Sequence, residues 1–205
     1  MAAMASKGKS KALDRREVVR TLLAGRGKLL VIAGLGAPAW DATDAGDHPL
    51  TFPLWGGMGG AAAIGLGLAL TQADRRVLVL TGDGELLMGM GSLATIGAQR
   101  PRNLSVVVLD NERYGETGMQ VSHTAFGVDL AAAAKACGFV SATMVTTIDQ
   151  VSRLRADLHR AVGPLFAQVK VAPHKLPLVL PPRDGAHLKD RFREALLGKG
   201  AYFQR

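Results

Sequence analysis

The chain has 205 residues, 48% of them hydrophobic, which is enough to bury one sizeable core, so we expect one domain. Its single cysteine excludes both a disulfide framework within the chain and an iron–sulfur cluster held by cysteines. No apolar run is long enough to span a bilayer, and the basic N-terminus lacks the apolar core of a signal peptide. We therefore expect a cytoplasmic protein with no membrane contact.

The formal net charge of +8 is concentrated near the N-terminus. Residues 1–28 contain eight lysines and arginines against two acids, a balance of +6, so the rest of the chain is close to neutral. A basic tail can bind nucleic acid or an acidic surface, but no aromatic residue precedes Trp40. We therefore interpret residues 1–12 as a solvated, disordered leader and expect no nucleic-acid partner.

The first predicted helix and strand lead into a glycine-rich turn. Asp14 can cap a helix over residues 15–24, and residues 29–33 are apolar enough for a buried strand. Residues 34–39, GLGAPA, then fit the dinucleotide fingerprint G-x-G-x-x-G/A. A dinucleotide-binding unit would continue with a helix, a second strand and an acid about 20 residues on. Residues 38–49 instead have the composition of a loop, which disfavours that interpretation.

A strand–turn–helix–strand unit carries the most informative polar residues. Val77–Leu80 is predicted to be a buried strand that ends in Gly-Asp-Gly, with Asp83 in the middle. A helical apolar pattern runs from Leu86 to Ile96, and a second buried strand, Leu104–Leu109, leads to Asn111. In an open α/β sheet, ligands bind at the carboxyl ends of parallel strands. A carboxylate and an amide oxygen there suit Mg²⁺ that also binds phosphate groups, so this unit predicts a metal-bridged diphosphate.

The remaining segments complete an α/β pattern, which predicts a single doubly wound, mostly parallel sheet with helices on both faces. We assign residues 13–172 to this domain and residues 173–205 to a proline-rich extension with a short C-terminal helix. The other predicted elements are an apolar helix within 56–70, a loop over 112–120, a helix over 130–137 capped by Asp129, a strand over 139–145, an amphipathic helix over 149–162, a last strand over 165–171 and a basic helix near 186–197.

The spacing of the two polar turns resembles a known cofactor motif. Gly-Asp-Gly followed after 26 residues by Asn resembles the metal motif of thiamine diphosphate (ThDP) enzymes. The resemblance implies that Asp83, Asn111 and the carbonyl oxygen of Arg113 hold Mg²⁺. It also implies that Gly36 and Ala37, in the turn after the first strand, contact the diphosphate through main-chain N–H groups. The other implied cofactor contacts are Gly82, Gly84, Glu85, Tyr114 and Gly115.

A second glycine-rich segment, LWGGMG at residues 54–59, resembles the part of these enzymes that holds the aminopyrimidine ring. The resemblance implies that the Gly56 carbonyl accepts a hydrogen bond from the 4′-amino group. It implies that Met58 wedges the cofactor into its bent form, with Gly57 between the two, and an unbranched Met can fill such a space. The structural alternative is a buried Met that packs under the following helix.

Over residues 29–171 the chain is similar to the small β-subunits of 2-oxoacid decarboxylases of the sulfopyruvate and phosphonopyruvate type. The segments GGMGGAAAIGLGLAL, GDGELLMGMGSLATIG and LDNERYGETGMQ carry this similarity. It implies an enzyme that uses ThDP and Mg²⁺ to release carbon dioxide and an aldehyde from a small 2-oxoacid. Two departures bear on the substrate: Glu85 stands where a small hydroxyl residue is common, and Glu116 where Ser is common.

The resemblance also implies a partner. In the family, the glutamate that activates N1′ of the pyrimidine comes from a separate pyrimidine-binding domain. This chain has no second α/β domain, and none of its five glutamates lies in a segment similar to that one. We therefore expect an α-subunit that carries the pyrimidine-binding domain, in an α₂β₂ or larger assembly.

Two further side chains have an open role. His123 is a candidate proton donor or an ordinary loop histidine, and the Arg113 side chain either neutralises an acidic substrate group or is solvated. The alternatives to a decarboxylase are a ThDP-dependent carboligase or oxidoreductase, a dinucleotide-binding subunit and a ThDP-binding subunit without catalytic function.

Overall fold

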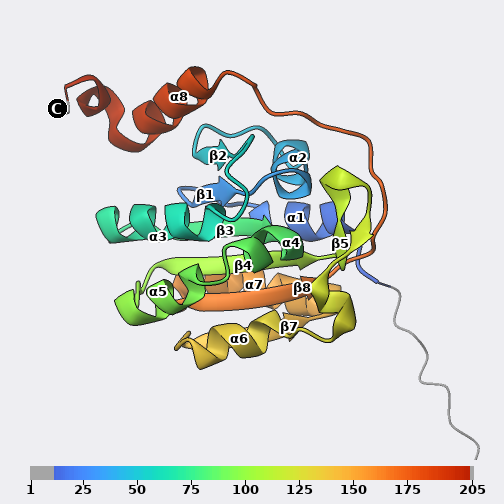
Figure 1. The fold of residues 1–205 in the computed structure, drawn as a ribbon. Helices are drawn as coiled ribbons and strands as arrows, with labels where there is room; N and C mark the ends of the chain where they lie inside the picture. The colour runs from blue at the N-terminus through green and yellow to red at the C-terminus, as the bar shows by residue number, and fades with distance from the viewer. Residues whose placement is uncertain (1–11, 204–205) are drawn as a thin grey trace, which may run out of the picture.

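A computed structural model of the chain describes residues 12–203, so the predicted leader lies outside the described residues except for its last residue. Six strands form one sheet in the order β2-β1-β3-β4-β8-β7, and every pairing in it is parallel (Figure 1). The strands are β1 (Leu30–Ala33), β2 (Thr51–Pro53), β3 (Val77–Gly82), β4 (Leu104–Asp110), β7 (Ser141–Val145) and β8 (Leu165–Lys170).

Helices cover both faces of the sheet, which confirms the predicted doubly wound α/β fold (Figure 1). Alternate residues of a strand point to opposite faces. In β3, Val77 and Val79 pack with α3, α5 and α6, whereas Leu78 and Leu80 pack with α1, α2 and α7. The helices are α1 (Arg15–Leu23), α2 (Ala37–Asp44), α3 (Ala61–Thr71), α4 (Asp83–Met88), α5 (Ser92–Gln99), α6 (Leu130–Ala136), α7 (Ile148–Arg160) and α8 (Gly185–Leu197).

Residues 38–49, predicted to be a loop, contain most of α2, and β2 follows shortly after, so that prediction was wrong. Pro38 lies in the first turn of α2, where a missing N–H removes no intrahelical hydrogen bond. Asp41 is buried because Arg15 and Arg16 pair with it, and Trp40 packs in the core. A helix and a strand therefore do follow the GLGAPA turn, although no acid ends β2 as a dinucleotide site would require.

Two other segments differ from the prediction. The helical pattern from Leu86 to Ile96 divides into α4 and α5, because the backbone at Gly89 lies directly against Gly59, whose carbonyl oxygen would be 2.0 Å from a Cβ there. The segment after Asn111 forms a small hairpin of β5 (Arg113–Tyr114) and β6 (Gln120–Val121) instead of a loop. Within residues 12–203 there are also three 3₁₀ turns: η1 (Gly115–Thr117), η2 (His123–Phe126) and η3 (Gly198–Tyr202).

After β8 the chain crosses the edge of the sheet in extended conformation, as the prolines predicted, and continues into α8 and then η3. We name residues 173–184 the strap (Figure 1). Helix α8 packs beside β2, where the rings of Phe52 and Phe192 meet edge to face at 5.8 Å and Arg191 pairs with Asp47 at 2.6 Å. Within the described part of the chain, no helix combines the length and the apolar character that crossing a membrane requires.

Candidate cofactor site

A cavity of about 420 Å³ lies at the carboxyl edge of the sheet. It brings together residues that are far apart in the sequence and that the motifs singled out. The turn between β3 and α4 contributes Gly82 to Glu85, the end of β4 contributes Asn111, and the hairpin contributes Arg113 to Thr117. Ala37 at the start of α2, Met58 and four residues of the strap complete the lining relevant here. The cavity therefore brings together most of the residues predicted for the site, whereas Gly36, Gly56, Gly57 and His123 are not among its lining residues.

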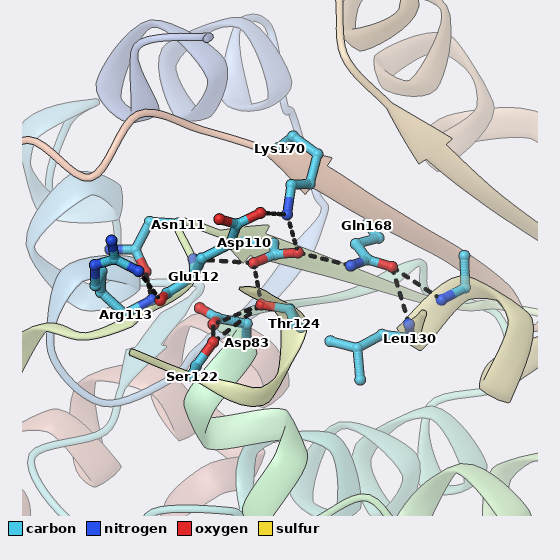
Figure 2. A network of polar contacts seen from close by, with 11 residues as sticks. Asp83, Asp110, Asn111, Glu112, Arg113, Ser122, Thr124, Leu130, Gln168 and Lys170 are labelled. Atoms are coloured by element: carbon cyan, nitrogen blue, oxygen red, sulfur yellow. Dashed lines mark hydrogen bonds and ion pairs between the residues drawn. The ribbon is translucent and has the colours of Figure 1, made fainter. Parts of the chain in front are cut away.

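Asp83 is the first residue of α4 and is 2% exposed. Its carboxylate accepts hydrogen bonds from Ser122 Oγ and, at 3.3 Å, from Thr124 Oγ1 (Figure 2). Burial raises the pKa of this carboxyl, the hydrogen bond from Ser122 opposes the rise, and the Asp110 charge adds to it. No lysine or arginine within residues 12–203 pairs with Asp83, so its charge lacks a cationic partner. A bound cation would supply that partner.

Asn111 lies in a tight turn beside Asp83. Its Oδ1 accepts a hydrogen bond from the Arg113 backbone N–H at 3.0 Å, and the residue between them, Glu112, has a positive φ of 61°. A side-chain carbonyl oxygen has two lone pairs, so Asn111 Oδ1 can still bind a metal. The described chain has no cluster of three or more His, Cys, Asp or Glu side chains that could hold a metal. A cation here would therefore use the predicted mixed set: the Asp83 carboxylate, the Asn111 amide oxygen and the Arg113 carbonyl oxygen.

A buried polar network behind this turn was not predicted. Asp110 is fully buried and accepts hydrogen bonds from Thr124 Oγ1 at 2.8 Å, Gln168 Nε2 at 2.6 Å and Lys170 Nζ at 2.9 Å (Figure 2). Lys170 also pairs with Glu112 at 2.5 Å. Although burial lowers the pKa of Lys170, the hydrogen bonds to Glu112 and Asp110 together raise it. The network fixes the end of β4, and with it the turn that carries Asn111.

Gln168 is the member of this network whose buried, hydrogen-bonded role could have been predicted from the sequence. Gln168 is an uncharged polar residue inside the apolar strand β8, where a buried amide needs partners. Its Oε1 accepts from the backbone N–H groups of Leu130 and Ala131 at 3.0 and 3.1 Å, at the start of α6. Ser122 and Thr124 lie in a short polar segment, and nothing local distinguishes them from surface residues.

The turn between β1 and α2 approaches two glutamates closely. A Cβ at Gly34 would lie 1.8 Å from Glu85 Oε2, and a Cβ at Gly36 would lie 2.7 Å from the side chain of Glu116. Gly36 also has a φ of 75°, which favours glycine. Its neighbour Ala37 lines the cavity at the start of α2, so the structure brings the predicted diphosphate turn to the residues predicted to bind the metal.

Glu85 is a buried residue of α4 that contacts four other segments. Its Oε2 accepts a hydrogen bond from Thr81 Oγ1 at 2.7 Å. Burial raises the pKa of Glu85, and Thr81 and the backbone N–H groups of Ala61, Leu35 and Gly59 partly oppose that rise. The side chain therefore connects β3 to the turn after β1, to the glycine-rich loop and to the start of α3. These contacts indicate a structural role for this departure from the family pattern.

Met58 lies in a glycine-rich loop at the rim of the cavity. Gly57 and Gly59 on either side have φ values of 69° and 90°, so this loop conformation favours glycine at both positions. Met58 is 37% exposed, so it does not pack as a buried core residue under the helix. It also lines a neighbouring hollow together with Tyr114 and His123. Tyr114 Oη and His123 Nδ1 are 3.2 Å apart, so His123 lies beside the main cavity instead of lining it.

The model of the family described as "Thiamine pyrophosphate enzyme, C-terminal TPP binding domain" matches residues 37–171. This range includes the cavity segments described above except the strap, the first turn and Arg15 of α1. The chain belongs to this family. The match confirms ThDP as the cofactor predicted from the motif, and Mg²⁺ is the usual metal of such a domain.

The relatives to which the chain is similar include 2-oxoacid decarboxylases and their subunits. The chain is 38% identical over 186 residues to the sulfopyruvate decarboxylase subunit beta of Methanothermobacter thermautotrophicus, covering 91% of this chain and 97% of that one. It is 37% identical over 164 residues to the phosphonopyruvate decarboxylase of Streptomyces viridochromogenes, covering 80% of this chain and 41% of that longer one. These matches confirm the predicted resemblance to decarboxylase β-subunits.

A solved structure supports the fold. Benzoylformate decarboxylase from Polynucleobacter necessarius superposes with a TM-score of 0.68 at 20% identity, over 87% of this chain and 36% of that one. At this identity the superposition shows that the two proteins share a fold.

Proposed function

We propose that this chain is the β-subunit of a ThDP- and Mg²⁺-dependent 2-oxoacid decarboxylase, completed by a partner with a pyrimidine-binding domain. One observation carries the proposal: a single cavity joins the Gly-Asp-Gly turn, the Asn111–Arg113 turn and the Met58 loop. The near full-length similarity to a sulfopyruvate decarboxylase subunit beta supports a decarboxylase over a carboligase or an oxidoreductase.

The residues of this chain have distinct tasks in that function. When bound, the thiazolium ring of ThDP supplies the electron sink that allows a 2-oxoacid to lose carbon dioxide. Asp83, Asn111 and the Arg113 carbonyl hold the metal, whose charge compensates the buried carboxylate. The Gly36 turn presents main-chain N–H groups to the diphosphate. The Gly56 carbonyl orients the amine of the pyrimidine, and Met58 supports the bend between the two rings.

The remaining cavity residues control solvent and protons. The β5–β6 hairpin packs tightly on the metal turn, because a Cβ at Gly84 would lie 2.6 Å from the ring of Tyr114. A packed wall of this kind helps to exclude water from the reacting atoms. His123 holds a ring nitrogen beside Tyr114 and close to Met58, where it can act as a proton donor to the product.

The chain's own glutamates support the need for a partner. Glu85 is buried and hydrogen-bonded within the fold, and Glu112 pairs with Lys170. Glu17 lies on α1 and Glu194 on α8, and neither lines the cavity. Only Glu116 faces the cavity freely enough to reach a cofactor, and it lies against Gly36, on the diphosphate side. Activation of N1′ by a glutamate of another subunit is therefore the consistent arrangement.

An exposed apolar rim indicates where that subunit would bind. Met58, Ile64, Met88 and Met90 are each more than one-third exposed, and they lie on the glycine-rich loop, α3 and the α4 region around the cavity. Methionine-rich exposed surfaces are typical of protein interfaces. Covering this rim would also close the cavity to water.

The test is to assay the full chain alone and after co-purification with its pyrimidine-domain partner, with ThDP, Mg²⁺ and a panel of 2-oxoacids. We expect aldehyde and carbon dioxide only from the complex, in an α₂β₂ or larger assembly. Robust turnover by the lone chain would contradict the proposal, since Glu116 would then have to activate N1′. A complex that forms ligation products and no aldehyde would favour the carboligase alternative.

A further inference from the structure

The strap is fixed across the open edge of the cavity at both of its ends. Before it, Ala172 donates its backbone N–H to the Leu13 carbonyl at 2.8 Å. In its middle, the Arg16 guanidinium donates to the Pro177 carbonyl. At its far end, Trp55 Nε1 donates to the Pro182 carbonyl at 2.7 Å. The segment is therefore held by contacts to α1 and to the loop after β2 and does not depend on its own secondary structure.

This path brings strap residues into the cavity wall. His174, Lys175, Leu176 and Leu178 all line the cavity. The strap thus adds two groups that can carry positive charge and two apolar side chains to a site that otherwise comes from the sheet edge. Because it lies outside the matched family segment, residues 37–171, the family match says nothing about these positions.

The strap groups differ from the other cations of the cavity. Arg15 is engaged by the buried Asp41 carboxylate, and the Arg113 guanidinium donates to the Glu112 carbonyl at 2.9 Å. Within residues 12–203, neither His174 nor Lys175 makes a side-chain hydrogen bond or an ion pair. Both residues are exposed as well as part of the cavity lining. A cationic side chain that lines a cavity and has no partner is available to bind an anionic ligand.

We propose that His174 and Lys175 form a subsite for a second acidic group of the substrate, one that is remote from the carboxylate lost as carbon dioxide. The ligand class is a 2-oxoacid with a further sulfonate, phosphonate or carboxylate, and this inference rests on the proposed decarboxylase function. A lysine on the departing carboxylate would stabilise the ground state and oppose its loss. The diphosphate has Mg²⁺ and main-chain N–H groups, so the non-reacting acid is the group that needs these cations.

The experiment compares substrates that differ only in the remote charge. Lys175→Gln and His174→Gln are assayed in the complex with the partner, using 3-sulfopyruvate, phosphonopyruvate and pyruvate. Lys175→Arg keeps the charge, and Lys189→Gln on α8, which pairs with Asp190 outside the cavity, is the matched control. If pyruvate turns over slowly, inhibition by sulfoacetate is compared with inhibition by acetate, which likewise differ only in the remote acidic group.

We expect kcat/KM for the two doubly charged substrates to fall about tenfold or more in Lys175→Gln, as for the loss of one charge-assisted hydrogen bond. The fall should be smaller in His174→Gln, with pyruvate and the affinity for ThDP unchanged. Lys175→Arg should recover most of the loss, and Lys189→Gln should show none.

Three results would overturn the subsite: equal losses for pyruvate and the charged substrates, a loss of ThDP affinity, or no loss at all. Failure of the proposed function is recognised separately, because the wild-type complex would then turn over no 2-oxoacid. In that case calorimetry of the full chain with sulfoacetate still tests the subsite. Binding that Lys175→Gln weakens would support it, and binding that the variant leaves unchanged would refute it.

Discussion

Replacing Asp83 by Asn tests the metal site most directly, because it removes the negative charge and keeps the shape of a buried side chain. The amide oxygen can still accept from Ser122 Oγ and Thr124 Oγ1. Burial raises the pKa of Asp83, so the charged form is disfavoured in the folded chain without a cation. This destabilisation of the folded chain is absent at a pH below the pKa of the carboxyl in the unfolded chain, and it grows as the pH rises above that pKa. At pH 7 and without metal, Asp83→Asn should therefore be at least as stable as the wild type.

With ThDP and Mg²⁺ bound, the wild type should instead be more stable than Asp83→Asn. At a ThDP concentration about 100 times the Kd, saturating with Mg²⁺, binding stabilises the folded chain by about 2.7 kcal/mol. For a chain of 205 residues, about 1 kcal/mol raises Tm by roughly 2–4 °C. The wild type should therefore gain roughly 5–11 °C, whereas Asp83→Asn, which lacks the only formal charge among the three metal donors, should gain almost nothing.

The assay is thermal unfolding of the full chain with and without ThDP and Mg²⁺. Asp129→Asn is the matched control, because Asp129 caps α6 by accepting from the Ala132 N–H at 2.9 Å and Asn caps helices equally well. The control should keep the cofactor-dependent rise in Tm. A full rise in Asp83→Asn would refute the assignment of Asp83 to the metal.

Three further changes test other parts of the site. Met58→Ala should lower turnover of the complex more than its ThDP affinity, because the metal and diphosphate provide most of the anchoring. Lys170→Met should lower the free energy of unfolding, because it leaves the buried Asp110 without a cation. Breaking a buried ion pair costs about 3–5 kcal/mol, and the loss here should lie near the lower end because Lys170 is partly exposed. Gly34→Ala should cost about 1–3 kcal/mol, and less when combined with Glu85→Ser, because the serine vacates the space that the new methyl group needs.

Each of these changes has a control and a contradicting result. Met144→Ala, which alters an exposed Met of β7 outside both the cavity lining and the apolar rim, should leave turnover unchanged. Equal turnover in Met58→Ala would show that the wedge is misassigned. Lys189→Met should leave denaturant midpoints nearly unchanged, and a similar midpoint for Lys170→Met would contradict the network. Fully additive costs in the Gly34–Glu85 cycle would contradict the contact between those two residues.

Much of the fold could be predicted because it depends on local patterns. The run Val77–Leu80 is apolar at every position, as a strand covered by helices on both faces must be, and the structure divides its residues between the two cores. Helix ends were also readable: Asp14 accepts from the Glu17 N–H at 2.9 Å, as its position before the helix predicted. The α2 segment was wrongly predicted because its buried acid, Asp41, pairs with Arg15, which lies 26 residues away in the sequence, and its second acid, Asp44, pairs with Arg20.

Some site residues could likewise be predicted from local sequence, whereas others depend on contacts between distant parts of the chain. Asp83 and Asn111 follow directly from the strands that carry them, so their proximity at the sheet edge was predictable. Thr124 could not be predicted as a bridge between two buried carboxylates, because that role depends on how η2 folds back over the sheet edge. The strap is more remote still, since its path depends on a hydrogen bond between Trp55 and Pro182, 127 residues apart.

The two glutamates that depart from the family pattern have different consequences for the substrate. Glu85 also lines the cavity, but it is buried and accepts a hydrogen bond from Thr81, so it is less accessible to a ligand than an exposed carboxylate. Glu116 lines the cavity and adds negative charge beside Gly36. A substrate with two acidic groups would be repelled there unless another wall supplied positive charge. Lys175 and its neighbour on the strap face the same cavity, so the strap is the element on which acceptance of a doubly charged oxoacid should depend.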